Sequence, residues 1–237
     1  MAKYAYYVDL SICAGCEACT VACQNKNGLA YDMRYTKVER LMVGTFPDLK
    51  SSFITTQCMH CDEPPCAQVC PTGATYKSSE GPVIVGDEKC IGCQYCMTAC
   101  PYDARSFDEA EHVAKKCTFC FDRLAKGEKP ACVQTCLTGA RQIGDLENPE
   151  DPIHKAIAAQ DVFQVGGTSF YYKLPAGIDR SAVPANFETS SITWAWQSIF
   201  QPAGQILMGS TVGAILISLA ANALKSMRKE GNEHGDH

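Results

Sequence analysis

Sixteen cysteines are the residues of this 237-residue sequence whose type and spacing point most directly to chemistry. The segment "CIGCQYCMTACP", from Cys90 to Pro101, shows the recurring pattern of closely spaced thiols. Groups one and three have the spacing C-x2-C-x2-C-x3-C, while the middle gap widens to four residues in group two and to eleven in group four. The four groups are Cys13, Cys16, Cys19 and Cys23; Cys58, Cys61, Cys66 and Cys70; Cys90, Cys93, Cys96 and Cys100; and Cys117, Cys120, Cys132 and Cys136.

Three kinds of site use many cysteines, and the spacing favours one of them. Disulfide bonds do not suit the pattern, because cysteines three residues apart offer poor geometry for closing distant loops. Structural zinc is an alternative, since group four alone has the two separated pairs of a zinc module. A loop with a cysteine at every third position can supply three thiolates to one [4Fe-4S] cubane. Sixteen thiols therefore predict four [4Fe-4S] clusters.

Each cubane needs a fourth thiolate from another part of the chain. In bacterial two-cluster ferredoxins the last cysteine of such a run binds the other cluster, so two runs exchange one ligand each. Cys70 and Cys100 are both followed by proline, whereas Cys23 and Cys136 are not. Groups two and three are therefore interpreted as one two-cluster module, and groups one and four as a second module into which the first is inserted.

This pairing predicts four ligand sets, one for each cluster. They are cluster A (Cys13, Cys16, Cys19, Cys136), cluster B (Cys117, Cys120, Cys132, Cys23), cluster C (Cys58, Cys61, Cys66, Cys100) and cluster D (Cys90, Cys93, Cys96, Cys70). His60, in "CMHC", could also bind metal. Because the four thiols of its group suffice, we expect it instead in the loop or behind the ligands.

The charge of the chain excludes one class of function and raises a question about the clusters. The formal net charge is −5, and no long basic run precedes the end of the chain, so nucleic-acid binding is not expected. An oxidised cubane with its thiolates carries about −2, which takes the total to roughly −13. Cations close to cysteines in the sequence could offset this charge, although each could also be an ordinary solvated side chain: Lys89, Arg105, Lys115, Lys116, Arg123 and Arg141.

Short regular elements are expected around the cysteine groups, so the clusters must supply much of the core. The residue pattern predicts strands at Tyr4–Asp9, Ala74–Lys77 and Val83–Val85, in "TKVERLMVG" and "SSFITTQC", and in "ARQIG" from Ala140. Short helices are expected between the third and fourth cysteines of groups one to three. Another helix is expected from Asn148 and Pro149 through Ile153 and Ile157, followed by a strand or extended arm in "VGGTSFYYKLPAG".

The segment from Gln205 to Leu224 has no charged residue, and its 20 residues would form a helix about 30 Å long, enough to cross a bilayer. Aromatic residues precede it and basic residues follow it, as expected at the two faces of a membrane: Trp194, Trp196 and Phe200 before, and Lys225, Arg228 and Lys229 after. A buried helix of a soluble domain is the alternative. Gly209 and Gly213 form a GxxxG motif, which favours close packing against a helix of a membrane subunit.

The distribution of basic residues predicts how the chain sits in the cell membrane. Residues 185–204 contain no lysine or arginine, so the positive-inside rule places the C-terminus in the cytoplasm. The cluster domain would then lie on the periplasmic or outer side. No signal peptide is visible at the start of the sequence, so export as the folded passenger of a partner is expected.

The nested order of the groups, with "CPTGA", "CIGCQYCMTACPYDAR" and "CTFCFDRLAKGEKPACVQTC", resembles the four-cluster electron-transfer (beta) subunits of molybdopterin oxidoreductases. These enzymes contain molybdenum or tungsten, and they include dimethyl sulfoxide, polysulfide, thiosulfate and arsenate reductases and formate dehydrogenases. The resemblance covers roughly Lys3 to Pro175. The single C-terminal anchor is similar to that of the formate dehydrogenase beta subunit. Some relatives replace one ligand in group three, but all four cysteines remain here, which favours four cubanes over a [3Fe-4S] centre.

The resemblance implies a non-catalytic relay of single electrons in an anaerobic respiratory complex. Clusters A and B would face a molybdopterin-containing catalytic subunit, and clusters C and D a quinone-reactive integral membrane subunit. The sequence itself lacks a GxGxxG motif, a P-loop and a nucleophile motif, so it does not predict an enzyme. The alternative functions are electron transfer in a membrane-bound hydrogenase or another respiratory complex and, last, structural zinc binding.

The expected fold is α+β, with two nested ferredoxin-like modules of two clusters each and one C-terminal transmembrane helix. The expected domains are the outer module (1–30 and 110–146), the inserted hairpin and inner module (31–109), a helix and extended arm (147–198), a transmembrane anchor (199–229) and a polar tail (230–237).

Overall fold

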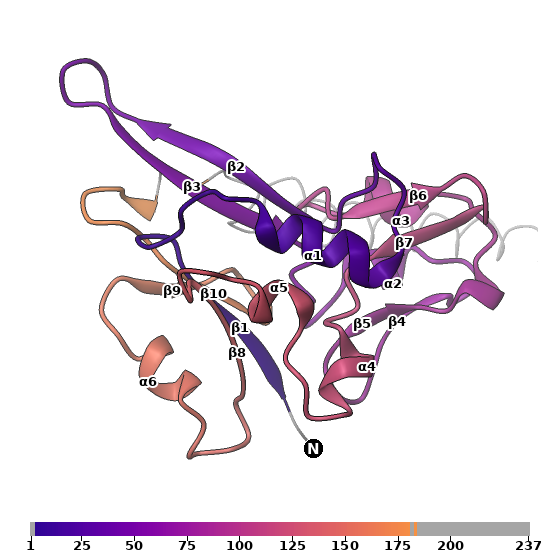
Figure 1. Cartoon of the computed structure of the whole chain (residues 1–237). Coiled ribbons are helices and arrows are strands. Elements are labelled where there is room, and N and C mark those ends of the chain that lie inside the picture. The colour runs from indigo at the N-terminus through magenta and orange to yellow at the C-terminus, as the bar shows by residue number, and fades with distance from the viewer. Residues whose placement is uncertain (1–2, 181–182, 184–237) are drawn as a thin grey trace, which may run out of the picture. The chain divides into compact units, whose positions relative to one another are not determined.

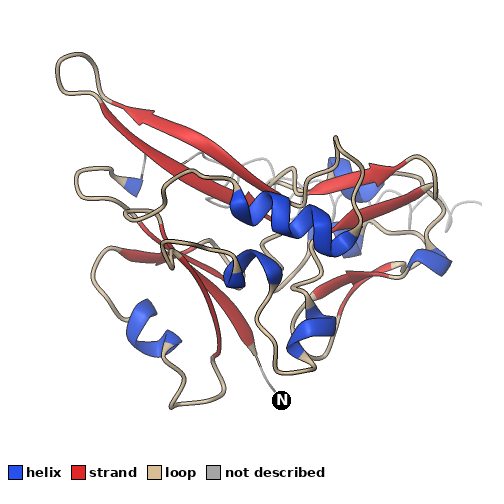
Figure 2. Cartoon of the chain, in the orientation of Figure 1, coloured by secondary structure: helices blue, strands red, loops and turns tan. Residues whose placement is uncertain are grey.

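The computed structural model describes residues 3–180 and 183 of the chain. Short strands and helices alternate along these residues and are joined by long loops (Figures 1 and 2). The strands are β1 (Tyr4–Asp9), β2 (Thr36–Val43), β3 (Lys50–Gln57), β4 (Thr75–Lys77), β5 (Val83–Val85), β6 (Arg105–Asp108), β7 (Val113–Lys116), β8 (Arg141–Asp145), β9 (Val162–Gln164) and β10 (Phe170–Lys173). The helices are α1 (Ala18–Asn27), α2 (Pro65–Gln68), α3 (Tyr95–Thr98), α4 (Phe121–Leu124), α5 (Ala131–Gln134) and α6 (Ile153–Ile157), with a 3-10 turn at Asp87–Lys89.

One four-stranded sheet joins the two ends of the described chain, in the order β8-β1-β10-β9. Strand β1 pairs antiparallel with β8, so that Tyr6 faces Ile143, and parallel with β10, so that Tyr6 also faces Phe170. Because β1 precedes the first cysteine group and β8 follows the fourth, these two groups are brought to the same sheet. The remaining strands form three separate hairpins, β2–β3, β4–β5 and β6–β7.

Most of the expected strands are confirmed. Strand β1 covers the expected residues, "TKVERLMVG" and "SSFITTQC" form the long hairpin β2–β3, and the hairpin β4–β5 lies within one residue of its expected position. The expected strand from Ala140 is β8. Helices are present near the expected positions in groups one to three, but each begins one residue before the third cysteine, and α1 continues beyond the fourth, to Asn27. Helix α5 adds a similar short helix in group four.

The helix expected to begin at Asn148 and Pro149 begins later, at Ile153. The carboxylate of Asp151 accepts hydrogen bonds from the backbone N–H of Ile153 at 2.9 Å and of Asp145 at 2.9 Å. A side chain that binds these amides holds the preceding residues in turns, so helix α6 starts only after it.

The segment "VGGTSFYYKLPAG" was expected to form a strand or an extended arm, and its residues Phe170–Lys173 form strand β10 of the main sheet. Strands β9 and β10 form a hairpin, and β10 lies between β9 and β1. The hairpin β6–β7 was not expected, and the domain boundary expected between residues 109 and 110 falls inside its turn.

The centre of the described chain is an aromatic cluster. Tyr6 stacks on Phe170 with ring centroids 4.9 Å apart and meets Phe119 edge-on at 4.8 Å. All three side chains are almost completely buried. Since Phe119 lies between two cysteines of group four, burial of these rings fixes the group-four loop against β1 and β10.

No helix within residues 3–180 is long and apolar enough to cross a membrane. The expected span at Gln205–Leu224, its aromatic and basic flanks, the Gly209 and Gly213 motif and the polar tail lie outside the described residues.

Candidate metal centres

Four of the helices carry cysteines, and they pack in two pairs. Helix α1 packs on α5, and α2 packs on α3. Helix α1 contains Cys19 and Cys23, and α5 contains Cys132, so groups one and four lie together. Helices α2 and α3 contain Cys66 and Cys96, so groups two and three lie together.

One cavity gathers the four thiols predicted for cluster C. Cys58, Cys61 and Cys66 line it from group two, and Cys100 lines it from group three. Burial raises the pKa of the Cys100 thiol to about 11, with a smaller contribution from the thiols of Cys58 and Cys66. Burial likewise raises the pKa of Cys61. Four thiolates in one cavity would repel one another, so this cavity suits a group that supplies positive metal ions.

Thiols of groups one and four also lie close enough to affect one another. Burial raises the pKa of Cys23 to about 12, and the charges of Cys132 and Cys120 add to the effect. The pKa of Cys117 is raised by burial and then by Cys23 and Cys132. These four residues are the set predicted for cluster B. In cluster A, the charges of Cys132 and Cys13 add to the burial that raises the pKa of Cys19.

The fourth cysteines of groups two and four are surrounded by donors. The Thr75 backbone N–H lies 3.5 Å from the Cys70 sulfur, and the Thr72 hydroxyl lies 3.7 Å from it. Although burial opposes it, these and other backbone N–H groups lower the pKa of Cys70. In the same way burial is outweighed by backbone N–H groups and by Thr138, which lower the pKa of Cys136. Both sites therefore favour a thiolate, the form that binds iron.

The donor set and its surroundings fit [4Fe-4S] clusters. Among the described residues no three His, Cys, Asp or Glu side chains converge on a position for a single metal ion. Four of the residues that line the cavity of group two are cysteines, and thiolates select iron–sulfur clusters among a few soft metal groups. Bound there, such a cluster would accept and donate one electron at a time.

Two glycines shape the tightest cysteine loops. Gly15 and Gly92 each precede the second cysteine of their group, and both have positive φ, +66° and +67°. A Cβ atom on Gly15 would lie 2.5 Å from the ring of Phe53, and one on Gly92 would lie 2.8 Å from the backbone oxygen of His112. The chain at both loops is therefore too close to its neighbours for any side chain.

Replacing Gly15 by alanine is expected to lower the occupancy of cluster A, because the loop from Cys13 to Cys16 must move away from Phe53. The matched control is Gly28→Ala, since Gly28 has a similar φ of +59° but open space around it. Iron content and the spectrum of each purified variant check this. Equal iron in both variants would show that the contact with Phe53 does not matter.

His60 is fully buried beside the group-four loop. Its Nδ1 atom accepts the backbone N–H of Val83 at 3.0 Å, and its ring meets Phe119 edge-on at 4.2 Å. Burial, followed by the nearby charges of Lys116 and others, keeps its pKa well below the usual value, so the ring is neutral. His60 thus packs the loop of group two against the loop of group four.

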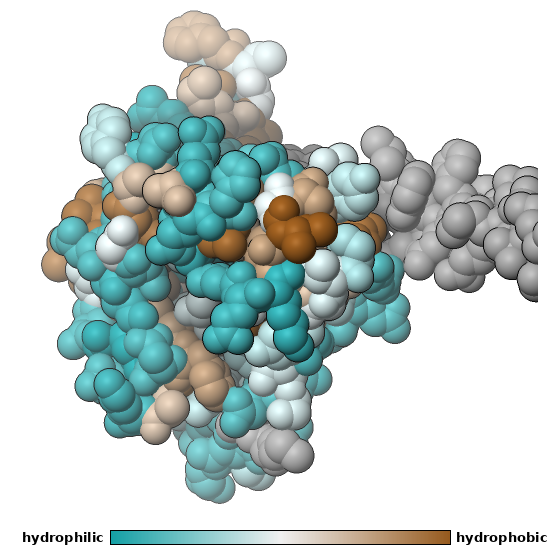
Figure 3. Space-filling model, turned by 90° about the vertical axis from the view of Figure 1, so that its right-hand side faces the viewer, coloured by the Kyte–Doolittle hydropathy of each residue, from teal (hydrophilic) through white to brown (hydrophobic). Residues whose placement is uncertain are grey.

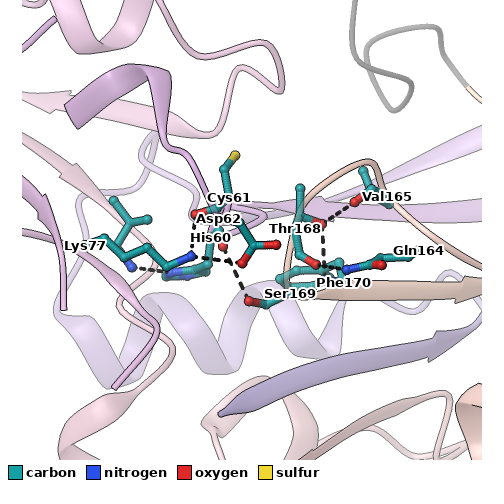
Figure 4. A network of polar contacts seen from close by, with 10 residues as sticks. His60, Cys61, Asp62, Lys77, Gln164, Val165, Thr168, Ser169 and Phe170 are labelled. Atoms are coloured by element: carbon teal, nitrogen blue, oxygen red, sulfur yellow. Dashed lines mark hydrogen bonds and ion pairs between the residues drawn. The ribbon is translucent and has the colours of Figure 1, made fainter. Parts of the chain in front are cut away.

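Residues of the β9–β10 hairpin also contact the loop of group two (Figure 4). The Ser169 hydroxyl donates to the backbone oxygen of His60 at 3.4 Å. The backbone N–H of Ser169 donates to the backbone oxygen of Met59 at 3.2 Å. Lys77 reaches the Cys61 carbonyl at 2.9 Å and the Asp62 carboxylate at 3.0 Å. This loop is thereby fixed to β10 and β4 without using its thiols.

Several supporting residues were not found from the sequence. The Tyr6 hydroxyl lies 3.6 Å from the Cys132 sulfur, the Gln57 amide 3.9 Å from the Cys117 sulfur and the Asn27 amide 3.5 Å from the Cys23 sulfur. Gln57 immediately precedes Cys58, and Asn27 follows Cys23 by one helical turn, so these two had a weak positional signal. Tyr6 had none, because its contact depends on the pairing of β1 with β8.

Comparison with known proteins gives the family. Residues 49–146, which include groups two, three and four, match the 4Fe-4S dicluster domain. The chain is 38% identical over 187 residues to the B subunit of the sulfite dehydrogenase of Allochromatium vinosum, covering 70% of this chain and 78% of the relative. It is 39% identical over 161 residues to the B subunit of the polysulfide reductase of Wolinella succinogenes, covering 67% and 84%. It is 34% identical over 206 residues to the arsenate respiratory reductase iron-sulfur subunit of a Shewanella species, covering 67% and 88%.

These relatives are electron-transfer subunits of a dehydrogenase and of two reductases rather than catalytic subunits. The sixteen cysteines match the four [4Fe-4S] clusters that subunits of this type carry, and the fold is a small α+β ferredoxin-like one. The chain therefore belongs to the family of four-cluster iron–sulfur subunits that transfer electrons in the respiratory complexes of molybdopterin oxidoreductases.

Proposed function

We propose that this subunit relays single electrons along the line A, B, C, D, with the four ligand sets predicted from the cysteine spacing. The observation that carries this proposal is the cavity of group two, which Cys100 of group three enters. It supports ligand exchange within the inner module. The packing of α1 on α5 supports the same exchange in the outer module.

The exposure of the cysteines supports this order of the clusters. All four cysteines of set B are buried, and Cys58 is among the thiols whose charges raise the pKa of Cys117 after burial. Clusters B and C would therefore meet in the interior. Cys16 of set A and Cys93 of set D are exposed. Electrons would thus enter and leave at clusters A and D.

A large exposed apolar side chain is next in sequence to a cysteine of set A and to a cysteine of set D. Leu137, next to Cys136 of set A, is 84% exposed, and Ile91, next to Cys90 of set D, is 63% exposed. The surface on the side of β6 and β7 is otherwise mainly hydrophilic, with separate hydrophobic patches (Figure 3). Exposed apolar residues beside a redox centre fit surfaces that a partner covers. We assign the end at cluster A to the molybdopterin-containing catalytic subunit and the end at cluster D to a quinone-reactive membrane subunit.

Charge substitutions at the two ends are expected to release different partners. Leu137→Glu should weaken binding of the catalytic subunit at least tenfold, and Ile91→Glu should do the same for the membrane subunit, because each buries a carboxylate in an apolar contact. Co-purification of tagged variants in mild detergent checks this. Loss of the same partner from both variants, or of neither, would contradict the assignment.

The membrane anchor and its orientation are part of the proposal. The uncharged segment Gln205–Leu224 is long enough to span a bilayer, and the basic residues that follow it support a cytoplasmic C-terminus. The cluster domain would face the periplasm, and the small residues Gly209 and Gly213 would contact the membrane subunit. A C-terminal green fluorescent protein fusion should fluoresce, while external protease should cut the cluster domain in spheroplasts. The opposite pattern would reverse the orientation.

Isolation of the intact complex tests the function as a whole. The tagged full-length chain should be purified anaerobically in mild detergent, with its partners. We expect a large subunit containing molybdenum or tungsten, and reduction of the clusters on addition of a quinol. A [NiFe] hydrogenase subunit in its place would support the alternative respiratory complex, and zinc without sulfide would support a structural role.

A further inference from the structure

Two buried arginines occupy equivalent positions in the two modules. Arg105 is the fifth residue after Cys100 and begins β6, and Arg141 is the fifth after Cys136 and begins β8. Their exposed fractions are only 5% and 3%. A guanidinium group keeps its charge under all conditions in proteins, so each module contains a permanent buried positive charge.

Both guanidinium groups have nitrogen atoms without a partner. Arg105 donates from Nη1 to the Thr75 hydroxyl at 3.3 Å, but its Nη2 atom has no partner. Arg141 donates from Nη2 to the Gln57 amide oxygen, but its Nε and Nη1 atoms have none. Within residues 3–180 neither arginine forms an ion pair with a carboxylate. Burying such a charge is costly unless an anion compensates it.

The anions near both side chains are thiolates from two clusters. For Arg105, burial lowers the pKa, but the charges of Cys66 and Cys96 outweigh it. For Arg141, burial is outweighed by Cys132 and Cys19. Cys66 and Cys96 belong to sets C and D, and Cys132 and Cys19 to sets B and A. Arg105 also lines the cavity of group two together with Cys100. Each arginine is therefore close enough to thiols of both ligand sets of its module to be affected by their charges.

Three of the other four cations close to cysteines already have partners, and the fourth is exposed. Lys115 pairs with Asp87 at 2.7 Å and with Glu111 at 2.6 Å, and Arg123 pairs with Glu128 at 3.3 Å. Lys116 is buried, but its amino group donates to the backbone oxygens of Val83 and Cys117. Lys89 is exposed. Of the six cations close to cysteines, only Arg105 and Arg141 are buried, have donor nitrogen atoms without a partner and are affected by thiols of two ligand sets.

We propose that Arg105 and Arg141 are positioning charges that raise the reduction potentials of the two clusters beside them, C and D for Arg105 and A and B for Arg141. This inference rests on the proposed ligand sets. A cubane gains one electron on reduction, so its charge changes from about −2 to −3. A fixed positive charge in a medium of low dielectric constant stabilises the reduced form more than the oxidised form. Removing the charge must therefore make both neighbouring clusters harder to reduce.

The test is a redox titration of the purified complex, in which electron paramagnetic resonance monitors the reduction of each cluster. In Arg105→Gln we expect two potentials to fall by at least 59 mV each, which is a tenfold change in the ratio of reduced to oxidised cluster. In Arg141→Gln the other two potentials should fall. The conservative variants Arg105→Lys and Arg141→Lys should keep all four potentials near those of the unaltered protein. Arg40→Gln, which removes an exposed arginine on the hairpin β2–β3, is the matched control.

Iron content decides the outcome if a glutamine variant assembles poorly. Loss of two clusters in the glutamine variant but not in the lysine variant supports the proposal, because the charge is then needed to hold the clusters. Equal loss in both variants overturns it, since packing rather than charge would be responsible. Full iron with unchanged potentials also overturns it. The proposed function itself fails separately, if the unaltered complex lacks four clusters or a molybdopterin subunit.

Discussion

Replacing Cys100 by serine is expected to remove the cluster held by group two, although Cys100 belongs to group three in the sequence. Cys100 lines the same cavity as Cys58, Cys61 and Cys66. Serine is a poor ligand for a soft metal centre, so one of four cubanes should be lost or converted. Iron should fall from about 16 to about 12 atoms per chain. Electron transfer through the complex should fall at least a hundredfold, because cluster C is an interior step of the relay.

The reciprocal variant separates ligand exchange from local damage. Cys70→Ser should affect the cluster of group three, because Cys70 follows α2 and this helix packs on α3. The two variants are matched, since each replaces the fourth cysteine of its group and each cysteine precedes a proline. Electron paramagnetic resonance of both proteins, compared with Cys61→Ser and Cys93→Ser, identifies the missing signal. If Cys100→Ser resembles Cys93→Ser, each group binds its own cluster and the exchange is wrong.

Truncation of Phe119 to alanine is expected to cost about 3–5 kcal/mol of stability, the usual range for removing a buried phenylalanine. Its ring contacts His60 at 4.2 Å, Tyr6 at 4.8 Å and Phe170 at 6.2 Å between centroids. It therefore joins the loop of group two, the loop of group four and the main sheet. We expect clusters B and C to be lost at a lower temperature than in the unaltered protein. The visible absorption of the clusters, recorded during heating under anaerobic conditions, measures this loss.

Two other substitutions show whether burial of the Phe119 ring is the cause of the lost stability. Phe119→Leu keeps part of the apolar volume and should lose about half as much stability as the alanine variant. Tyr31→Ala removes an aromatic ring that is 92% exposed and should change stability by no more than about 0.5 kcal/mol. A Phe119→Ala protein as heat-stable as Tyr31→Ala would show that this ring does not hold the modules together.

The local elements could be predicted where the residue pattern is strong. The paired segments of β2–β3 predicted the strands of that hairpin directly. Strand β1 was predicted from a weak alternation, although five of its six residues are buried in the structure. The hairpin β6–β7 was missed because its strands, "RSFD" and "VAKK", carry charges at their ends and no clear alternation. Two of these charges, Arg105 and Lys116, are buried beside the thiols rather than exposed. A pattern based on hydrophobicity does not predict that charged side chains are buried.

The long-range arrangement was less accessible than the local one. The parallel pairing of β1 with β10 joins residues more than 160 positions apart, and nothing near Phe170 indicates its partner. The cysteine groups are different, because their spacing follows from the size and ligand number of a cubane. The ligand types could therefore be predicted without knowledge of the fold. The two arginines could be noted as nearby cations, but only the structure separates them from Lys115 and Arg123.

The most direct test of a four-cluster relay is a count of iron and acid-labile sulfide in the anaerobically purified subunit. Four cubanes require about 16 iron atoms and about 16 sulfides per chain, with four distinct one-electron signals on reduction. We expect this content with no stoichiometric zinc. Zinc without sulfide, or iron and sulfide sufficient for only one or two cubanes in fully loaded protein, would contradict the account.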